Sequence, residues 1–386
     1  KFGDVPYTTK VLSIKESMSI ARTAKATVIA NVLADLDEVI NGNYLPTSYD
    51  ADNKGRITRW AAMAIKAKIY LFEGNWTQVK NITSTIMTEG GFKLFGSYAG
   101  LFEIANEYNS EVILDAQYRP TSREHQMMYV FLPPTLGGYS QLSPLQELVD
   151  SYIMLDGKTI KETGTSFDES HPYANRDPRL KATVMYTGNS YTLADGTEVV
   201  INCEKGEGKD GYGVGSDCSA TGYYIKKYWD NTYRATLYSG LNPILIRYAD
   251  ILLMNAEALA ELGELDKTAW DATIKPIRDR AGFTLASALE FPEGASKDKL
   301  IEIVRNERRS ELALEGHRHK DIIRWRIADN VLNGWCHGLK TNDVVGTDDG
   351  YVRVENRTFN ANRHYLWPIP QAERDLNGNL EQNPNW

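Results

Sequence analysis

The feature of this sequence that most restricts its fold is a helix-ending glycine pattern that occurs twice. Ala67 lies seven residues before Gly74, and Ala256 lies seven residues before Gly263. Each glycine is followed by one polar and one apolar residue, after which a second amphipathic segment begins. Glycine ends helices because it adopts the left-handed conformation at no steric cost. Both segments therefore predict a helix, a tight turn and a second, antiparallel helix.

Hydrophobic periodicity extends this pattern to further helices. The predicted helices are residues 21–40, 60–72, 76–88, 244–262, 267–280, 297–315 and 319–332. We expect Pro276 to interrupt the fifth of these, because proline removes a helical hydrogen bond. Repeated helix pairs are typical of tetratricopeptide-type arrays, in which each pair buries its apolar face against the next. Two unrelated helical hairpins are the alternative.

Residues 89–240 differ in composition from the predicted helices and are rich in Gly, Pro, Asn and Tyr. Short strand-like runs occur at 111–116 and 180–186. We therefore predict a mainly α protein of helix pairs with a large irregular portion that contains small β-sheets. The prediction is one unit over residues 1–386. Its helical scaffold lies mostly in 10–88 and 244–332, and its irregular, ligand-binding portion mostly in 89–240 and 333–386.

Charge and motif content exclude several classes of function. The 43 basic and 51 acidic residues give a net charge of 43 − 51 = −8 with no basic stretch, so nucleic acid is not an expected partner. No catalytic serine elbow, zinc-protease motif or phosphate loop occurs. The glycine run at 211–215 lacks the strand and helix of a dinucleotide site. We expect no metal and no cofactor.

The densest charged segment is residues 305–311, where Glu307 and Glu311 continue an apolar helical stripe. Carboxylates four residues apart on a helix are about 5–6 Å apart, so a glycosidase pair is one interpretation. A general acid needs a raised pKa, however, and the arginines nearby in the sequence would keep both groups ionised. We predict a buried ion-pair network instead. Its expected members are Glu307, Arg308, Glu311, Glu315, Arg318, Asp321 and Arg324.

Cys203 and Cys218 flank a glycine-rich loop. A disulfide between them would pin this loop and would stabilise the fold by about 3 kcal/mol on the loop-entropy model. Such a pairing implies an oxidising compartment. Two free thiols are the alternative.

Four stretches of the sequence carry motifs that occur together in one family. They are residues 2–6 (Phe-Gly-Asp-Val-Pro), 246–258, 305–318 and 366–386, the last of which contains Pro-Ile-Pro and ends Gln-Asn-Pro-Asn-Trp. In these stretches the sequence resembles the SusD/RagB family of nutrient-binding outer-membrane lipoproteins of Bacteroidetes. Asn385 stands where the family usually has glycine, a substitution that a position with positive φ tolerates.

The resemblance implies a non-enzymatic protein that binds oligosaccharide or a starch-like polysaccharide at the cell surface. It implies four tetratricopeptide-like helix pairs, a SusC-type TonB-dependent porin as partner, and attachment to the outer membrane through an N-terminal lipid. In the family the Gly-Asp-Val-Pro signature follows a signal peptide, a lipidated cysteine and a long helical segment. We therefore expect that upstream segment to be missing from this chain.

Aromatic residues with polar tips suit sugar binding, since sugars present apolar faces and hydroxyl edges. The sequence holds 22 Tyr and 8 Trp against 10 Phe. The residues that we expect to contact ligand are Trp229, Tyr228 and Tyr233, with Tyr139 and Trp335 behind them. For any one of them, ordinary packing is the alternative. Two other functions stay open: a helical-repeat scaffold that binds only protein, and a glycoside hydrolase that uses Glu307 and Glu311.

Overall fold

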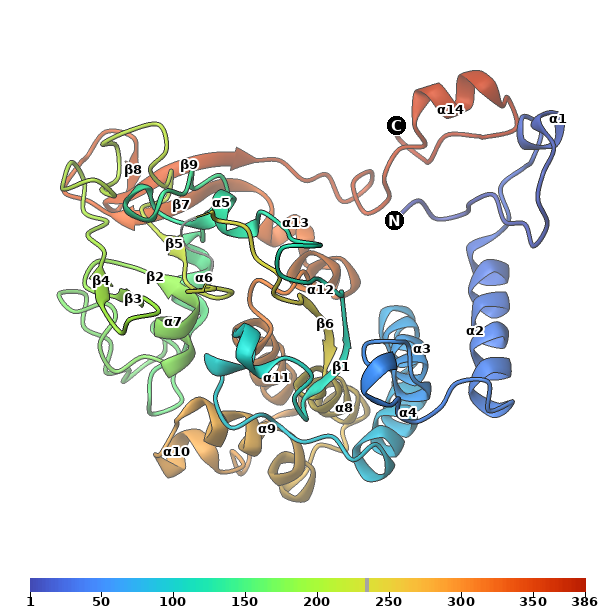
Figure 1. Ribbon diagram of the computed structural model, residues 1–386, viewed down its shortest axis with the longest axis horizontal. Helices are drawn as coiled ribbons and strands as arrows, with labels where there is room; N and C mark the ends of the chain where they lie inside the picture. Colours follow the sequence, from blue (N-terminus) through green and yellow to red (C-terminus); the bar gives the residue numbers. More distant parts are fainter. Residues whose placement is uncertain (233–235) are drawn as a thin grey trace. The chain divides into compact units, whose positions relative to one another are not determined.

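The computed structural model describes residues 1–232 and 236–386 (Figure 1). The chain divides into two compact units. Unit 1 comprises Lys1–Pro46, His319–Gly334 and Arg357–Trp386, and unit 2 comprises Thr47–Arg318 and Trp335–Asn356. Among the described residues, none of the helices has the length and apolar character needed to cross a bilayer.

Two helix pairs form the regular part of unit 2. The first pair is α3 (Arg59–Glu73) and α4 (Trp76–Glu89), and the second is α8 (Tyr248–Leu262) and α9 (Lys267–Ala281). Gly74 and Gly263 end the first helix of each pair in the left-handed conformation, with φ of 70° and 73°. Helix α8 packs on both α4 and α11 (Lys297–Glu311), so the pairs share one apolar core (Figure 1). The predicted helix–turn–helix pairs are confirmed.

Some of the predicted helices differ in the structure, and the helix expected at 319–332 is two helices, α12 (Arg318–Arg324) and α13 (Ala328–Val331). Residues 244–247 form strand β6 (Ile244–Arg247), which pairs antiparallel with β1 (Val112–Asp115), so the helix begins at Tyr248. Helix α11 ends at Glu311 rather than at residue 315, and Leu314 has a φ of 63°. Helix α9 continues through Pro276. Proline inside a helix lowers its stability by about 3 kcal/mol. Burial of apolar side chains such as Trp270, each of which contributes about 1.5–3 kcal/mol, offsets this cost.

The irregular portion of unit 2 consists of short elements. The helices are α5 (Met127–Phe131), α6 (Gln146–Ser151), α7 (Pro178–Thr183) and α10 (Ala286–Leu289), with the 3-10 turns η1 (Ala51–Asn53), η2 (Gly100–Phe102), η3 (Ile104–Asn106) and η4 (Pro134–Leu136). The strands are β2 (Val184–Met185), β3 (Ser190–Thr192), β4 (Glu198–Val200), β5 (Tyr224–Ile225), β7 (Gly334–Lys340), β8 (Thr347–Asp348) and β9 (Tyr351–Arg357). The predicted strand at 180–186 is therefore mostly helix α7, and only its end is β2.

These short elements surround a second apolar core. Strand β2 pairs with β5, β3 pairs with β4, and β7, β9 and β8 form a three-stranded sheet in that order. Buried tyrosines contribute to this core along with aliphatic side chains; Tyr152, Tyr191 and Tyr224 are fully covered. The Tyr191 and Tyr224 hydroxyls donate to the main-chain carbonyls of Ile225 and Asp210 at 2.7 and 2.5 Å. The hydrogen bonds of Tyr191 and Tyr224 offset the cost of burying their hydroxyls.

Unit 1 contains α1 (Ile14–Ser17), α2 (Lys25–Asn41), α13 (Ala328–Val331) and α14 (Gln371–Leu376), together with most of α12 (Arg318–Arg324). The opening and closing sequence motifs meet here. Arg22 donates to the Phe2 carbonyl at 3.0 Å and to the Asn383 side chain at 2.6 Å, and Asn383 also donates to Phe2. Asn385 has a φ of 65°, as expected for a residue at a usual glycine position. These motifs therefore hold the two ends of the chain together.

Candidate functional site

The charged stripe of α11 lies at the centre of a buried ion-pair network in unit 2. Its carboxylates are Glu111, Asp177, Glu307, Glu311 and Glu315, and its cations are Arg179, Lys227, Arg247, Arg278 and Arg280. Glu311 contacts Arg179 at 2.8 Å, Arg247 at 2.5 Å and also Arg280. Burial alone would raise the pKa of Glu311, but these three guanidinium groups outweigh it and lower the pKa.

The predicted role of Glu307, Glu311 and Glu315 agrees with these contacts. Cations distant in sequence, such as Arg179, pair with the three carboxylates. Arg308 forms a buried pair with Asp250 at 2.6 Å. Each contact lies where two elements cross, which neither helical spacing nor sequence distance can specify.

Two other predicted members, Asp321 and Arg324, pair with each other at 2.9 Å within unit 1. Arg318 begins α12 and lies near Arg309, whose pKa falls to about 10 mainly through burial and secondarily through the charge of Arg318.

A general acid of the glycosidase type does not fit Glu307 and Glu311. Both carboxylates are buried to within 1% of their surface, so a glycan has no route to them. Burial raises the pKa of Glu307 less than Arg179 and Arg278 lower it, so the group is ionised at neutral pH. The pair therefore lacks both access and a proton to donate.

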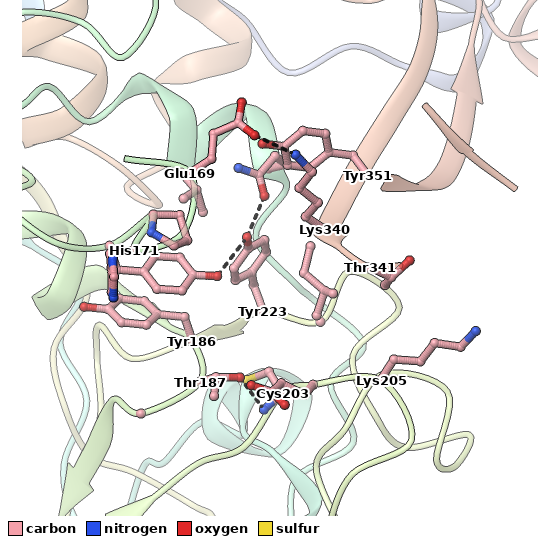
Figure 2. A pocket seen from close by; sticks show the side chains of 18 of the residues that line it. Glu169, His171, Tyr186, Thr187, Cys203, Lys205, Tyr223, Lys340, Thr341 and Tyr351 are labelled. Atoms are coloured by element: carbon pink, nitrogen blue, oxygen red, sulfur yellow. Dashed lines mark hydrogen bonds and ion pairs between the residues drawn. The ribbon is translucent and has the colours of Figure 1, made fainter. Parts of the chain in front are cut away.

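A cavity of about 980 Å³ lies elsewhere in unit 2, on the irregular portion (Figure 2). Its walls come from segments distant in sequence: residues 167–176, 186–188 with 203–207, and the β7–β9 region. Cys203, Tyr223 and Leu339, which belong to the second apolar core, form part of its lining. Gly222 has a φ of 74°, and a Cβ there would lie 1.8 Å from the Leu339 side chain. The cavity is thus built directly on packed core.

Stacked tyrosines form one wall of this cavity. The rings of Tyr173 and Tyr186 lie 3.9 Å apart with an interplanar angle of 16°. The Tyr173 and Tyr223 hydroxyls are 3.3 Å apart, and Tyr223 donates to the Gln146 side chain at 2.5 Å. Burial raises the pKa of Tyr173 to about 12, so its hydroxyl remains a neutral donor and acceptor. Tyr351 faces the same hollow from β9 (Figure 2).

Exposed ion pairs connect the walls of the cavity across its rim. Lys340 of β7 contacts Glu169 at 2.9 Å, and Lys205 contacts Asp343. All four side chains are well exposed, and such pairs contribute only about 0–1 kcal/mol. Their charged groups are therefore available to hydrogen-bond a polar ligand at little cost. Among the described residues, no cluster of three side chains suited to metal binding occurs.

His337 of β7 fixes the sheet beside the cavity. Its Nδ1 lies 2.8 Å from Glu147 of α6, and its Nε2 lies 3.0 Å from Asp348 of β8. Partial burial alone would lower the pKa of His337, but the hydrogen bonds to Asp348 and Glu147 outweigh it and raise the pKa. An imidazolium that donates to both carboxylates is the form that satisfies this geometry.

Four of the aromatic residues singled out from the sequence do not line this cavity, namely Trp229, Tyr228, Tyr139 and Trp335. Tyr228 is only 8% exposed and packs edge-on against Phe102 at 5.2 Å, so little of its ring is open to a ligand. Trp229 is half-buried, and its Nε1 donates to the Thr192 carbonyl at 2.8 Å. Tyr233 lies outside the described residues.

Two predicted aromatics are exposed elsewhere. Tyr139 is 39% exposed, and Trp335 is 42% exposed with the Arg353 guanidinium 5.7 Å from its ring. Sequence reasoning missed Tyr173, Tyr186 and Tyr351, because they come from three separate irregular segments. High tyrosine content was the one signal that pointed to them.

The predicted disulfide is not present, since all three cysteines carry free thiols. Cys203 is buried in the second apolar core, where desolvation raises the pKa of its thiol. Cys218 Sγ lies 3.3 Å from the carbonyl of Lys209, to which it donates. The glycine-rich loop is held instead by main-chain contacts, such as Tyr212 N to the Cys203 carbonyl at 3.1 Å.

Comparison with known families gives a match to the SusD family model over residues 101–386. A SusD-like protein of Formosa agariphila is 28% identical over 86% of this chain and 61% of its own length. A SusD-like protein of Bacteroides ovatus is 24% identical over 78% of this chain and 53% of its own. The chain thus spans about three fifths or less of the length of these two curated relatives.

Solved structures with the same fold include a SusD-like carbohydrate binding protein from Bacteroides fragilis. It is 29% identical, covers 98% of this chain and 76% of its own, and has a TM-score of 0.86. A laminarin binding SusD-like protein has a TM-score of 0.65 at 23% identity, covering all of this chain and 74% of its own, and so shows the fold alone. Both agree with a mainly α architecture of helix pairs with small sheets.

Proposed function

The chain belongs to the SusD family, and from this premise we propose that it binds glycan at the cell surface and passes it to a SusC-type TonB-dependent transporter of the outer membrane. The observation that carries the proposal is the cavity with the stacked pair Tyr173 and Tyr186 in its wall. We propose this cavity, rather than the residues chosen from the sequence, as the place where glycan binds.

The chemistry of the cavity suits a sugar. A pyranose ring offers an apolar face, which an aromatic ring covers, and a belt of hydroxyls, which need donors and acceptors. The wall supplies tyrosine rings with neutral hydroxyls, and the rim supplies carboxylates and ammonium groups. A volume of about 980 Å³ is at the large end for small-molecule sites and accommodates more than one sugar unit.

The relatives support the ligand class. One similar structure is described as a carbohydrate binding protein and another as laminarin binding. Because the second is only 23% identical, laminarin is a first probe here and not an assigned ligand. Attachment to the outer membrane through an N-terminal lipid and partnership with the transporter rest on family membership.

A division of labour within the chain completes the proposal. The helix pairs in 10–88 and 244–332 serve as scaffold and transporter-facing portion, and the irregular residues 89–240 and 333–386 capture ligand. The position of the cavity on the irregular portion supports this division. Purification of the full-length protein from membranes, with detection of a co-purifying TonB-dependent transporter, tests the partnership.

The glycan site is tested by isothermal titration against laminarin, starch and xylan, with Tyr186→Ala and Tyr186→Phe as a matched pair. We expect Tyr186→Ala to weaken binding about tenfold, which corresponds to about 1.4 kcal/mol, and Tyr186→Phe to bind nearly as well as wild type. Trp229→Ala, outside the cavity, serves as a control. Unchanged affinity of Tyr186→Ala refutes the assignment of the cavity.

A protein-binding scaffold without glycan affinity is the competing function. It predicts no heat of binding with any of these polysaccharides, together with retention of a transporter partner. The tyrosine-lined wall of the cavity favours the glycan-binding function.

A further inference from the structure

Charged side chains line the cavity, and their balance bears on which glycans it can hold. With histidine counted as neutral, seven lining residues carry a formal charge at pH 7. The cations are Arg176, Lys205 and Lys340, and the anions are Glu169, Glu204, Glu207 and Asp343. Their charges sum to 3 − 4 = −1, in a chain whose net charge is −8. The lining is therefore slightly negative although it contains three cations.

The guanidinium group of Arg176 is occupied by the main chain. It donates to the carbonyls of Val149 and Pro172 at 2.7 and 2.8 Å, and to the carbonyl of Tyr152 at 2.7 and 3.2 Å. Arg176 is also only 5% exposed. A planar pair of N–H donors is what recognises a carboxylate or sulfate in two-point fashion. The bonds to the main chain use this fork, so Arg176 does not offer it to a ligand.

Each of the two lysines faces a carboxylate. Lys340 Nζ lies 2.9 Å from Glu169 (Figure 2), and Lys205 Nζ contacts Asp343. An anionic group that took either lysine would lie beside the carboxylate that it displaced, and the two like charges would repel. A sugar hydroxyl meets no such repulsion, because it accepts from an ammonium group and donates to a carboxylate at the same time.

The remaining charges of the lining are negative. Glu204 and Glu207 are exposed on one turn, where the Glu207 N–H donates to the Glu204 carbonyl at 3.2 Å. Within residues 1–232 and 236–386, no cation pairs with either carboxylate. His171 also lines the cavity, but its Nδ1 lies 2.9 Å from Asp168, so a proton on this ring is matched by a carboxylate.

We propose that the cavity binds uncharged glycans and rejects glycans that carry uronate or sulfate groups. This inference rests on the proposed function and adds the charge class of the ligand to it. The hydroxyls of an uncharged sugar satisfy both signs of charge on the rim. A polyanion instead meets a slightly negative lining whose cations already have partners. A field of this sign also lowers the local concentration of an anion before contact.

Matched ligands separate the effect of charge from that of shape. The probes are laminarin, starch and xylan, together with the hydroxyethyl and carboxymethyl ethers of each glycan that binds. Both ethers add similar bulk, but only the carboxymethyl ether adds charge. In isothermal titration at about 20 mM salt, we expect the carboxymethyl ether to bind about tenfold more weakly than the hydroxyethyl ether. The difference should shrink at about 500 mM salt, because salt screens repulsion between exposed charges.

The double variant Glu204→Gln/Glu207→Gln tests the source of the selection. It changes the charge of the lining to −1 + 2 = +1 and keeps polar acceptors in place. We expect its affinity for the carboxymethyl ether to rise about threefold at low salt, and its affinity for the uncharged glycan to stay within about twofold of wild type. Glu302→Gln removes an exposed carboxylate of α11 that does not line the cavity, and it serves as the control. Thermal unfolding checks that each variant is folded.

Naturally anionic polysaccharides complete the experiment. If alginate or polygalacturonate binds wild type as tightly as the best uncharged glycan, the inference is refuted while glycan binding stands. Equal affinity for the two ethers at low salt would show that charge does not govern the selection, and a double variant that leaves their difference unchanged would show that the lining charge is not its cause; either result refutes the inference. If no glycan of either class binds wild type, the proposed function fails and the inference with it.

Discussion

Replacement of Glu311 by glutamine is the sharpest test of the buried network. Glu311 is 0% exposed and contacts the guanidinium groups of Arg179, Arg247 and Arg280. Among the described residues, the ion pairs of this network join five carboxylates and five cations, so their charges sum to 5 − 5 = 0. Glu311→Gln keeps the shape of the side chain and leaves one buried positive charge without compensation.

The expected cost follows from that uncompensated charge. Removal of one partner from a buried ion pair costs about 3–5 kcal/mol, against about 5–15 kcal/mol for the stability of a whole domain. With a urea m-value of about 3 kcal/mol/M, the unfolding midpoint falls by roughly 1–1.7 M. The assay is urea unfolding followed by tryptophan fluorescence at pH 7.

Glu302→Gln is the matched control, because Glu302 lies on the same helix but is exposed and pairs with Lys299 at 3.1 Å. An exposed pair of this kind stabilises a protein by about 0.3–0.5 kcal/mol, so the urea midpoint of Glu302→Gln should stay near that of wild type. A Glu311→Gln midpoint that matches Glu302→Gln would show that the network does not hold the fold together, and the reasoning would be refuted.

Acid adds an independent check on the network. Burial raises the pKa of Glu315 less than Arg247 and Lys227 lower it, to about 2, and the pKa of Glu311 is lowered as well. A depressed native pKa contributes stability that is complete above the unfolded value of about 4.3 and is lost as pH falls towards the native value. Wild type should therefore lose stability between about pH 4.5 and 2, and Glu311→Gln should lose less over the same interval.

Two further predictions concern His337 and the thiols. Since the pKa of His337 is raised in the folded chain, its contribution is present below the unfolded pKa of about 6.5 and is lost as pH rises through the native value. The difference in urea midpoint between wild type and His337→Gln should thus shrink from pH 6 to pH 9, and a difference that grows with pH would contradict the two-carboxylate arrangement. Cys203 and Cys336 are buried, so a thiol reagent should modify them slowly in the folded protein. After unfolding without reductant, all three cysteines should react. A count of fewer than three reactive thiols would show that two of the cysteines are joined in a disulfide.

Local sequence signals were sufficient to predict the helix pairs. Gly74 and Gly263 mark their turns because a left-handed residue ends a helix whatever surrounds it. The strand at 244–247 escaped the same reasoning, since a short apolar run is compatible with either state. Its pairing with β1, which is about 130 residues away in sequence, decided the outcome.

The cavity could not be predicted residue by residue, because its tyrosines share no spacing. Tyr173 and Tyr186 stack only after α7 and β2 reverse the chain between them, and Tyr351 arrives on β9. Tyr228 belongs to a run rich in aromatic residues, but its side chain is buried in the core. Composition therefore indicated that tyrosines matter in the irregular portion, but burial decides which of them a ligand reaches.

The spacing of the charged residues on α11 predicts which carboxylates are buried, but it does not predict which cations pair with them. Helical geometry placed Glu307 and Glu311 on the inward face of α11, and a carboxylate on such a face must find a cation, since burial of an unpaired charge is prohibitive. The existence of the network thus followed from the sequence. The identity of its cations did not, because any of 43 basic residues satisfies the electrostatics equally. Only the crossing of β6 with α11 selects Arg247, which contacts Glu311 and Glu315 together.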